Sequence, residues 1–185
     1  MRVILASKSP RRKELLGKLF DNFEIKVSEV NEELDEGIDV VSGVEILSVR
    51  KGAAVAEDNS DALVISSDTL VELDGVPLGK PRDKDEAYKM LRSLSGRAHN
   101  VHTGVAVHYK GRVFSGVATS TVHFKNLSDR EISEYVESGE PMDKAGAYGI
   151  QGGAGKFVSH YEGDFDNIVG LSLRLTGELI EEATK

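Results

Sequence analysis

Residues 3–20 carry the pattern around which the rest of the chain is organised, and their sequence is VILASKSPRRKELLGKLF. The stretch begins with an apolar run that is short enough for a buried β-strand. Leucine and phenylalanine then recur at helical spacing from Leu15 to Phe20. Ser9 suits the N-cap of a helix, and Pro10 suits its first position. The stretch therefore predicts a strand that turns directly into a helix.

Polar and basic side chains gather at the amino end of this predicted helix, namely Ser7, Lys8, Arg11 and Arg12. A cation at the positive end of the helix dipole loses about 0.3–1 kcal/mol, so the two arginines are unfavourable there without a partner. An anion would reverse the sign, because free backbone N–H groups, hydroxyls and cations together form a phosphate pocket. A solvated basic first turn explains the same residues, and this segment alone does not decide between the two interpretations.

The composition sets the class of protein. The chain has 185 residues, 39% of them hydrophobic, so it can bury a core, and we expect one domain spanning residues 1–185. The absence of cysteine excludes a disulfide scaffold, a thiolate zinc site and a cysteine nucleophile. No apolar run approaches the roughly 18–20 residues of a membrane span, and the start lacks a signal-peptide pattern. We therefore expect a cytoplasmic protein that does not bind membranes.

The charge of the chain limits its partners. A formal net charge of −8 and a pI near 5.2 argue against a broad basic face that wraps DNA or RNA. A small anionic ligand can still bind where local cations, with a divalent metal ion, overcome the global repulsion.

Residues 62–71 form the most strand-like segment, and their first half is apolar enough for a central strand. Asp68 within such a strand is costly unless it is paired or bound to a metal ion. The pair Asp74-Gly75 then signals a two-residue hairpin, which places position 69 opposite position 80 and so brings Lys80 beside Asp68 and Thr69. A structural salt bridge would explain Asp68 and Lys80 equally well.

The other predicted elements are less informative about chemistry. They are helices at about residues 43–57, 83–95, 128–138 and 170–183, and strands at residues 23–27, 101–109 and 112–124. Lys51 lies on the first of these helices, where a lysine is ordinarily a surface residue. The acidic residues between positions 29 and 36 are expected to form a solvated loop, from which one carboxylate could reach a site. The histidines at positions 99, 102, 108 and 123 have no helical metal-ligand spacing, so we interpret them as satisfied or exposed.

A glycine-rich stretch occupies residues 141–156, with five glycines between positions 146 and 155. This density favours neither helix nor strand and indicates that the backbone approaches something closely. The spacing does not match a P-loop. Asp143, Lys144 and Gln151 stand among these small residues as the specific contacts of a binding loop would, although a loose surface loop is the alternative.

Taken together, the motifs resemble the Maf family of nucleoside triphosphate pyrophosphatases, also known as septum formation inhibitors. The matching segments fall in the family's order and span almost the whole chain: Ser7-Lys8-Ser9-Pro10-Arg11-Arg12, Ser67-Asp68-Thr69, Gly79-Lys80-Pro81, Leu94-Ser95-Gly96 and Asp143-Lys144-Ala145-Gly146-Ala147-Tyr148-Gly149-Ile150-Gln151-Gly152. The resemblance implies a mixed α/β fold with an elongated twisted sheet, flanking helices and two lobes around a central cleft. It also implies a homodimer, and hydrolysis of a nucleoside triphosphate to the monophosphate and pyrophosphate with Mg²⁺ or Mn²⁺.

The resemblance also assigns roles to individual residues. Phosphate binding falls to Ser7, Arg11, Arg12, Lys51 and Lys80. Asp68 would act at the metal ion and the attacking water, together with a loop carboxylate that matches Glu32, with Glu33 a close rival. Catalysis would therefore involve Asp68, Lys80 and Glu32, and Asp68 and Glu32 would hold the metal ion. We place Asp143 and Lys144 near the substrate.

Within the family, Arg12, Thr69 and Gln151 together resemble the branch that acts on dTTP and UTP rather than the branch that takes 7-methyl-GTP. Two departures from the family pattern are visible: Ser66-Ser67 replaces the usual Gly-Ala, and Ser172 stands where proline is usual. The alternatives are a pyrophosphatase for modified or other nucleotides, such as dITP or CTP, and a division regulator that senses nucleotide without hydrolysing it.

Overall fold

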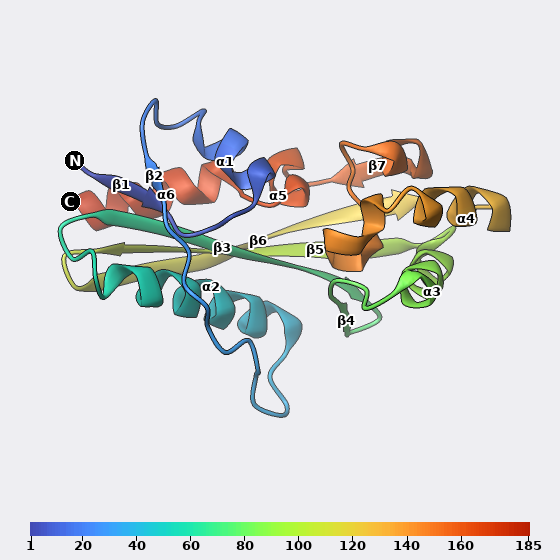
Figure 1. Cartoon of the computed structure of the whole chain (residues 1–185), viewed down its shortest axis with the longest axis horizontal. Helices are drawn as coiled ribbons and strands as arrows, with labels where there is room; N and C mark the ends of the chain where they lie inside the picture. Colours follow the sequence, from blue (N-terminus) through green and yellow to red (C-terminus); the bar gives the residue numbers. More distant parts are fainter. The chain divides into compact units, whose positions relative to one another are not determined.

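The computed structural model describes residues 1–185 and has the mixed α/β architecture that the sequence predicted (Figure 1). Its strands are β1 (Val3–Leu5), β2 (Glu24–Ile25), β3 (Leu63–Leu73), β4 (Val76–Leu78), β5 (Ala98–Tyr109), β6 (Arg112–Phe124) and β7 (Val158–Glu162). Its α-helices are α1 (Pro10–Leu16), α2 (Val40–Ala56), α3 (Lys84–Leu94), α4 (Asp129–Glu137), α5 (Phe165–Val169) and α6 (Leu173–Thr184). Three short 3₁₀ helices, η1 (Glu140–Asp143), η2 (Ala145–Ala147) and η3 (Gly153–Phe157), occupy the glycine-rich stretch. No helix is both long enough and apolar enough to cross a membrane.

The strands form one mixed seven-stranded sheet in the order β2-β1-β3-β5-β6-β7, with β4 paired to β3. β1 runs parallel to both β2 and β3, whereas β4 is antiparallel to β3 and β7 is antiparallel to β6. The predicted hairpin turn is present, because Asp74–Gly75 joins β3 to β4, and a second two-residue turn, Lys110–Gly111, joins β5 to β6. All four turn residues have positive φ, as two-residue hairpin turns require.

The chain divides into two compact units. The first unit contains residues 1–69, 103–118 and 170–185, and the second contains residues 70–102 and 119–169. The long strands β3, β5 and β6 each supply residues to both units.

In the first unit, helices pack on both faces of β3. The Ser66 hydroxyl donates a hydrogen bond to the Ser48 carbonyl of α2 at 2.6 Å, and the next hydroxyl, Ser67, donates to the Gly170 carbonyl just before α6 at 3.1 Å. Because successive side chains of a strand point to opposite faces, these contacts place α2 on one face and the start of α6 on the other, as Figure 1 shows. The Ser66-Ser67 departure from the family pattern therefore ties β3 to α2 and to the segment just before α6.

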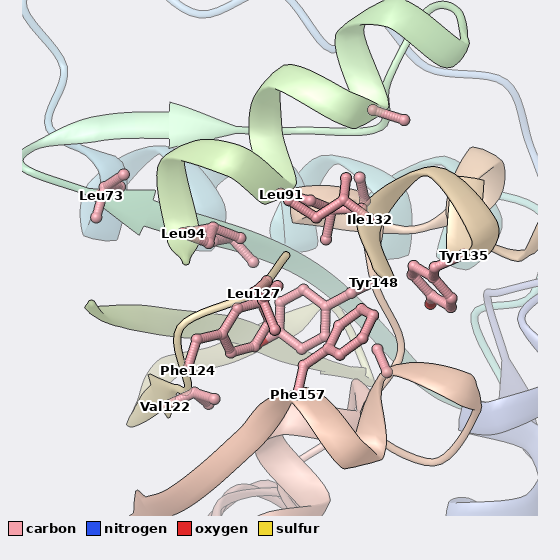
Figure 2. Packing of buried hydrophobic residues seen from close by; sticks show 14 of the residues in the cluster. Leu73, Leu91, Leu94, Val122, Phe124, Leu127, Ile132, Tyr135, Tyr148 and Phe157 are labelled. Atoms are coloured by element: carbon pink, nitrogen blue, oxygen red, sulfur yellow. The ribbon is translucent and has the colours of Figure 1, made fainter. Parts of the chain in front are cut away.

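The second unit has its own apolar core (Figure 2). Phe124 packs edge-on against Tyr148 with ring centroids 4.9 Å apart, and Tyr135 packs edge-on against Phe157 at 5.3 Å. Edge-to-face geometry at these separations is the arrangement that aromatic pairs prefer. Leu91 and the other apolar residues of α3 and α4 cover these rings.

Several expected element boundaries were wrong. The first helix ends at Leu16 rather than Phe20, because the chain leaves the helix at Gly17 through short-range turn bonds. The second helix begins at Val40, since Asp39 caps it by accepting a hydrogen bond from the Ser42 amide at 2.9 Å. β2 covers only Glu24–Ile25 instead of the expected residues 23–27, and both of its residues are exposed. β7 and α5 were not predicted, because their sequences have no clear period.

Candidate active site

The junction between β1 and α1 has the structure that the opening stretch predicts. The Ser9 hydroxyl caps α1 by accepting a hydrogen bond from the Arg12 amide at 3.4 Å, and Pro10 is the first helical residue. The Ser7 hydroxyl is buried and accepts a hydrogen bond from the Ser9 amide at 3.2 Å. The side chains of Ser7 and Ser9 are thus held at the amino end of the helix by local hydrogen bonds.

The Arg12 guanidinium is turned inward rather than toward solvent. Its Nε donates to the Gly170 carbonyl at 2.8 Å, and Nη2 donates to the Thr69 hydroxyl at 3.1 Å. The Thr69 hydroxyl in turn lies 3.0 Å from the Thr103 hydroxyl of β5. Gly170 has a φ of +138°, a backbone conformation that residues with a Cβ rarely adopt. A glycine at this position therefore allows the backbone carbonyl to meet the guanidinium.

Burial lowers the pKa of Arg12 from its ordinary value, the negative charge of Asp68 raises it, and the positive charge of Arg11 lowers it again. Arginine remains charged in spite of such shifts. Arg11 and Asp68 therefore both lie within electrostatic range of the Arg12 guanidinium.

Lys51 lies between two carboxylates. Its Nζ donates to Asp68 Oδ1 at 2.5 Å and lies 3.0 Å from Glu32 Oε1. The Lys51 and Asp68 side chains are 21% and 13% exposed, so this pair is largely shielded, whereas Glu32 is 64% exposed. Opposite charges in a shielded setting attract more strongly than they do in water. The two carboxylates are thus arranged around a single cation.

Glu32, and not Glu33, is the carboxylate that reaches this cluster. Arg50 holds the loop by donating from Nη1 to the main-chain carbonyls of Asn31 at 3.1 Å and Glu33 at 2.6 Å. The Asn31 side chain also accepts from the Glu33 amide at 2.9 Å, which forms a local turn. Arg50 and Lys51 are adjacent on α2, so the anchored loop presents the intervening Glu32 side chain to Lys51.

The polar part of β3 extends past the end of β1. The parallel ladder between β1 and β3 ends at Leu5 opposite Ile65. Asp68 and Thr69 follow this point and face opposite sides of β3, one toward α2 and the other toward α1. Ligands of α/β proteins commonly bind beyond the carboxyl ends of parallel strands, and this is the location of both side chains.

The remaining predicted residues lie in the second unit. The β3–β4 ladder pairs Val71 with Leu78 and so has the predicted register, and Lys80 follows it as an exposed side chain. Lys144 donates to the Glu140 carbonyl at 2.8 Å and to Asp143 Oδ1 at 2.9 Å. Gln151 is exposed.

The glycines of the 141–156 stretch pack against side chains of the protein itself. A Cβ at Gly152 would lie 1.7 Å from Glu140 Oε1, and the Gly153 amide donates to the same carboxylate at 3.1 Å. A Cβ at Gly149 would lie 2.7 Å from the Lys144 side chain. The predicted close backbone approach is therefore present, and the groups approached are Glu140 and Lys144.

The structure thus assembles two groups of predicted residues in the first unit. Ser7, Arg12 and Thr69 form one, and Glu32, Lys51 and Asp68 form the other. The Gly170 carbonyl, Thr103 and Arg50 also take part, and no local sequence signal marked them. Each acts through a main-chain atom or a neighbour that is distant in the sequence.

A family model described as Maf-like protein matches residues 2–183. The chain belongs to the Maf family. The match covers nearly the whole chain, as the resemblance implied, and it includes the motifs at positions 7–12, 67–69 and 143–152.

Curated relatives of this Maf chain share the name dTTP/UTP pyrophosphatase. The Bacillus velezensis protein is 45% identical over 98% of this chain and 96% of its own length. The Carboxydothermus hydrogenoformans protein is 47% identical over 98% of both chains, and the Thermococcus onnurineus protein is 43% identical over 97% of this chain and 96% of its own. Among solved structures, a HAM1 protein from Coxiella burnetii matches with a TM-score of 0.48 and 18% identity, over 83% of this chain and 90% of that one.

Proposed function

We propose that this protein hydrolyses dTTP and UTP between the α- and β-phosphates, which yields the nucleoside monophosphate and pyrophosphate. Membership of the Maf family and the shared name of relatives that are 43–47% identical support the proposal. The single observation that carries it is the cluster on β3, where Lys51 joins Asp68 to Glu32 while Arg12 binds the adjacent Thr69.

Triphosphate binding is the first task of these residues. Ser7, Arg11 and Arg12 stand at the amino end of α1, where backbone amides and cations favour an anion. Lys51 adds a partly shielded positive charge, and Lys80 supplies an exposed one. Phosphoryl transfer depends mainly on such charge neutralisation and on alignment of the attacking and leaving oxygens.

A divalent cation fits the Asp68–Glu32 pair. The Lys51 ammonium shows that both carboxylates can face one cation at the same time. Carboxylate oxygens suit Mg²⁺ or Mn²⁺. Asp68 and Glu32 would hold the ion, which lowers the pKa of a bound water and screens phosphate charge when it is present.

The chain's own residues would align the reaction. Asp68 accepts a hydrogen bond from the attacking water and takes its proton, while the hydrogen bond from Lys51 fixes the orientation of the carboxylate. Hydrogen bonds to Gly170 and Thr69 already hold the Arg12 guanidinium in place. Its positive charge can therefore face the phosphates without the side chain having to become ordered on binding. No side-chain nucleophile is needed, because water attacks phosphorus directly.

Base recognition would fall to Gln151. Gln151 has an amide with both a donor and an acceptor, which can pair with the edge of a pyrimidine. Asp143 and Lys144 are placed near it in the sequence, and Lys144 is fixed by two hydrogen bonds. Changing Gln151 to Glu is expected to shift the base preference.

The decisive experiment is an assay of pyrophosphate release from a panel of nucleotides: dTTP, UTP, CTP, dITP and 7-methyl-GTP. We expect dTTP and UTP to give the highest kcat/KM with Mg²⁺ or Mn²⁺, and no release in EDTA. A preference for dITP or 7-methyl-GTP would replace the proposed substrates while keeping the reaction. Binding of nucleotide without any turnover would contradict the enzyme and favour a nucleotide sensor.

The family resemblance also leads us to propose a cytoplasmic homodimer with a role in nucleotide-pool cleansing and septum formation. Light scattering of the purified protein would give its mass against the monomer mass of 20.1 kDa. A monomer at concentrations where the enzyme is active would contradict the dimer.

A further inference from the structure

Three possible metal ligands meet on the antiparallel strand pair β6–β7 of the second unit. Both strands are labelled in Figure 1. His123 comes from β6, and His160 and Glu162 come from β7. The candidate ligand atoms of the three side chains all lie within 4.8 Å of one another. None of these residues takes part in the candidate active site.

The strand register explains why these side chains share one face. His123 is directly opposite His160, and Glu162 is two residues farther along β7. Side chains two apart on a strand point to the same face, and directly opposite residues are close neighbours. The two imidazole rings are stacked, with centroids 3.9 Å apart and planes 15° apart. Because an imidazole binds a metal ion in the plane of its ring, the His123 ring, whose Nε2 has no hydrogen-bond partner, has to rotate for both rings to bind one ion.

A hydrogen-bond chain through Ser159 determines which nitrogen of His160 is free. The Ser159 hydroxyl donates its single proton to the His123 carbonyl at 3.1 Å. Its oxygen also lies 3.1 Å from His160 Nδ1, so in this contact Ser159 must accept, and Nδ1 must carry the proton. Neutral His160 then has an unprotonated Nε2. An outer hydrogen bond of this kind orients a metal-binding histidine and selects its tautomer.

His123 offers a second free nitrogen. Its Nε2 atom is buried and has no hydrogen-bond partner. Glu162 Oε1 lies 3.6 Å away, which is beyond normal hydrogen-bond distance. Buried polar atoms in proteins almost always have a partner, so this nitrogen lacks a group that would satisfy it.

We propose that His123, His160 and Glu162 bind one divalent transition-metal ion, with Zn²⁺ as the best chemical match. Two imidazoles and one carboxylate are a known zinc donor set that leaves a fourth position for water. Imidazole ligands also favour Zn²⁺, Ni²⁺ or Cu²⁺ over Mg²⁺, which separates this site from the carboxylate pair of the proposed active site. The ion would fasten the edge strand β7 to β6.

Zinc titration of the intact protein by isothermal calorimetry tests this site. With excess Mg²⁺ present to occupy the Asp68–Glu32 pair, we expect one tightly bound Zn²⁺ per chain. We expect His160→Ala and His123→Ala each to weaken this binding by about a hundredfold or more. Ser159→Ala keeps every ligand but removes the orienting hydroxyl, so it should weaken binding by about tenfold to a hundredfold. His108→Gln and Glu182→Gln remove an imidazole and a surface carboxylate elsewhere, and they should bind Zn²⁺ as the original protein does.

Two further measurements separate this site from other sources of zinc binding. Asp68→Asn should leave the zinc affinity of this site unchanged, because Asp68 belongs to the candidate active site with Glu32 and Lys51. Zn²⁺ at a hundredfold excess over its dissociation constant should raise Tm by about 5 °C in the original protein and not in His160→Ala. The proposal is overturned if the two histidine variants bind Zn²⁺ as tightly as the His108 control, or if Asp68→Asn alone abolishes binding.

Discussion

Asp68 and Thr69 are neighbours in the sequence, yet each is held by a cation from a different helix. Lys51 of α2 binds Asp68, and Arg12 of α1 binds Thr69. This difference follows from the alternation of side chains along β3. One short segment of strand can therefore position both the proposed metal-binding carboxylate and the guanidinium proposed to bind phosphate.

Asp68→Asn should lower kcat for dTTP hydrolysis by at least about a hundredfold, because the amide cannot accept the water's proton and is a poor ligand for a divalent cation. The fold should survive, since the amide oxygen can still accept the hydrogen bond from Lys51. Steady-state kinetics and circular dichroism would measure the two effects. A folded variant with near-normal kcat would remove Asp68 from the mechanism.

Glu32→Gln and Glu33→Gln form a matched pair at adjacent positions. We expect Glu32→Gln to reduce kcat/KM and to raise the Mg²⁺ concentration needed for half-maximal rate, because Glu32 faces Lys51 beside Asp68. Glu33→Gln should have little effect, since Arg50 binds Glu33 through its main-chain carbonyl. Equal losses in both variants, measured in a Mg²⁺ titration, would show that the loop carboxylate was assigned wrongly.

At the scale of elements, the position of α2 depends on a close backbone contact with β5. A Cβ at Gly104 would lie 2.5 Å from the main-chain carbonyl oxygen of Val44 and 3.0 Å from the Ser48 hydroxyl. Main-chain atoms of a helix cannot yield as a flexible side chain can. The glycine therefore sets the distance between β5 and the helix that carries Lys51.

Gly104→Ala is expected to destabilise the protein by about 1–3 kcal/mol through overpacking, and to lower kcat because α2 moves with Lys51. Gly177→Ala is the matched control, because a Cβ there meets nothing within 4 Å in the middle of α6. That change should stabilise the fold by about 0.5–1 kcal/mol. Urea unfolding would compare the two variants, and an unaltered stability in Gly104→Ala would disprove the tight contact.

A second feature at the scale of elements is the start of α6. Ser172 stands where the family usually has proline, and its hydroxyl caps α6 by accepting from the Leu175 amide at 3.2 Å. Serine is among the preferred capping residues. The departure from the family pattern thus starts the helix that follows Gly170, whose carbonyl holds Arg12.

For the whole molecule, a buried histidine of the second unit, His99, links stability to pH. His99 is 3% exposed and lies 2.6 Å from the Tyr148 hydroxyl. Burial lowers the pKa of His99 from 6.5 to about 4, with a smaller contribution from His123. The unfolded chain therefore binds more protons than the folded one between these values. This contribution to stability is present above pH 6.5 and is lost as the pH falls toward 4.

The free energy of unfolding should accordingly fall by about 2 kcal/mol between pH 7 and pH 5 on account of His99. His99→Gln cannot take up this proton, so its stability should decrease less over the same interval. His108, whose pKa burial also lowers, remains in both proteins and cancels in the difference. Urea titrations at several pH values give the two slopes, and parallel slopes would rule out the His99 contribution.

The sequence by itself determined the features that depend on neighbouring residues. Ser9 and Pro10 start α1, Asp83 and Ser128 cap α3 and α4, and two Xaa-Gly pairs form the hairpin turns. These devices act over two to four residues through hydrogen bonds and φ preferences, so their local pattern is sufficient. The family motifs likewise identified the candidate site residues.

Only the tertiary structure decided which of these residues meet. Arg12 reaches Gly170 across 158 positions, Glu32 rather than Glu33 faces Lys51, and the glycine-rich stretch closes on Glu140. The His123–His160 pair depends on the register of β7, a strand that had no sequence signal. Such contacts are set by strand pairing and helix packing between distant segments. The residues next to a side chain in the sequence therefore do not predict them.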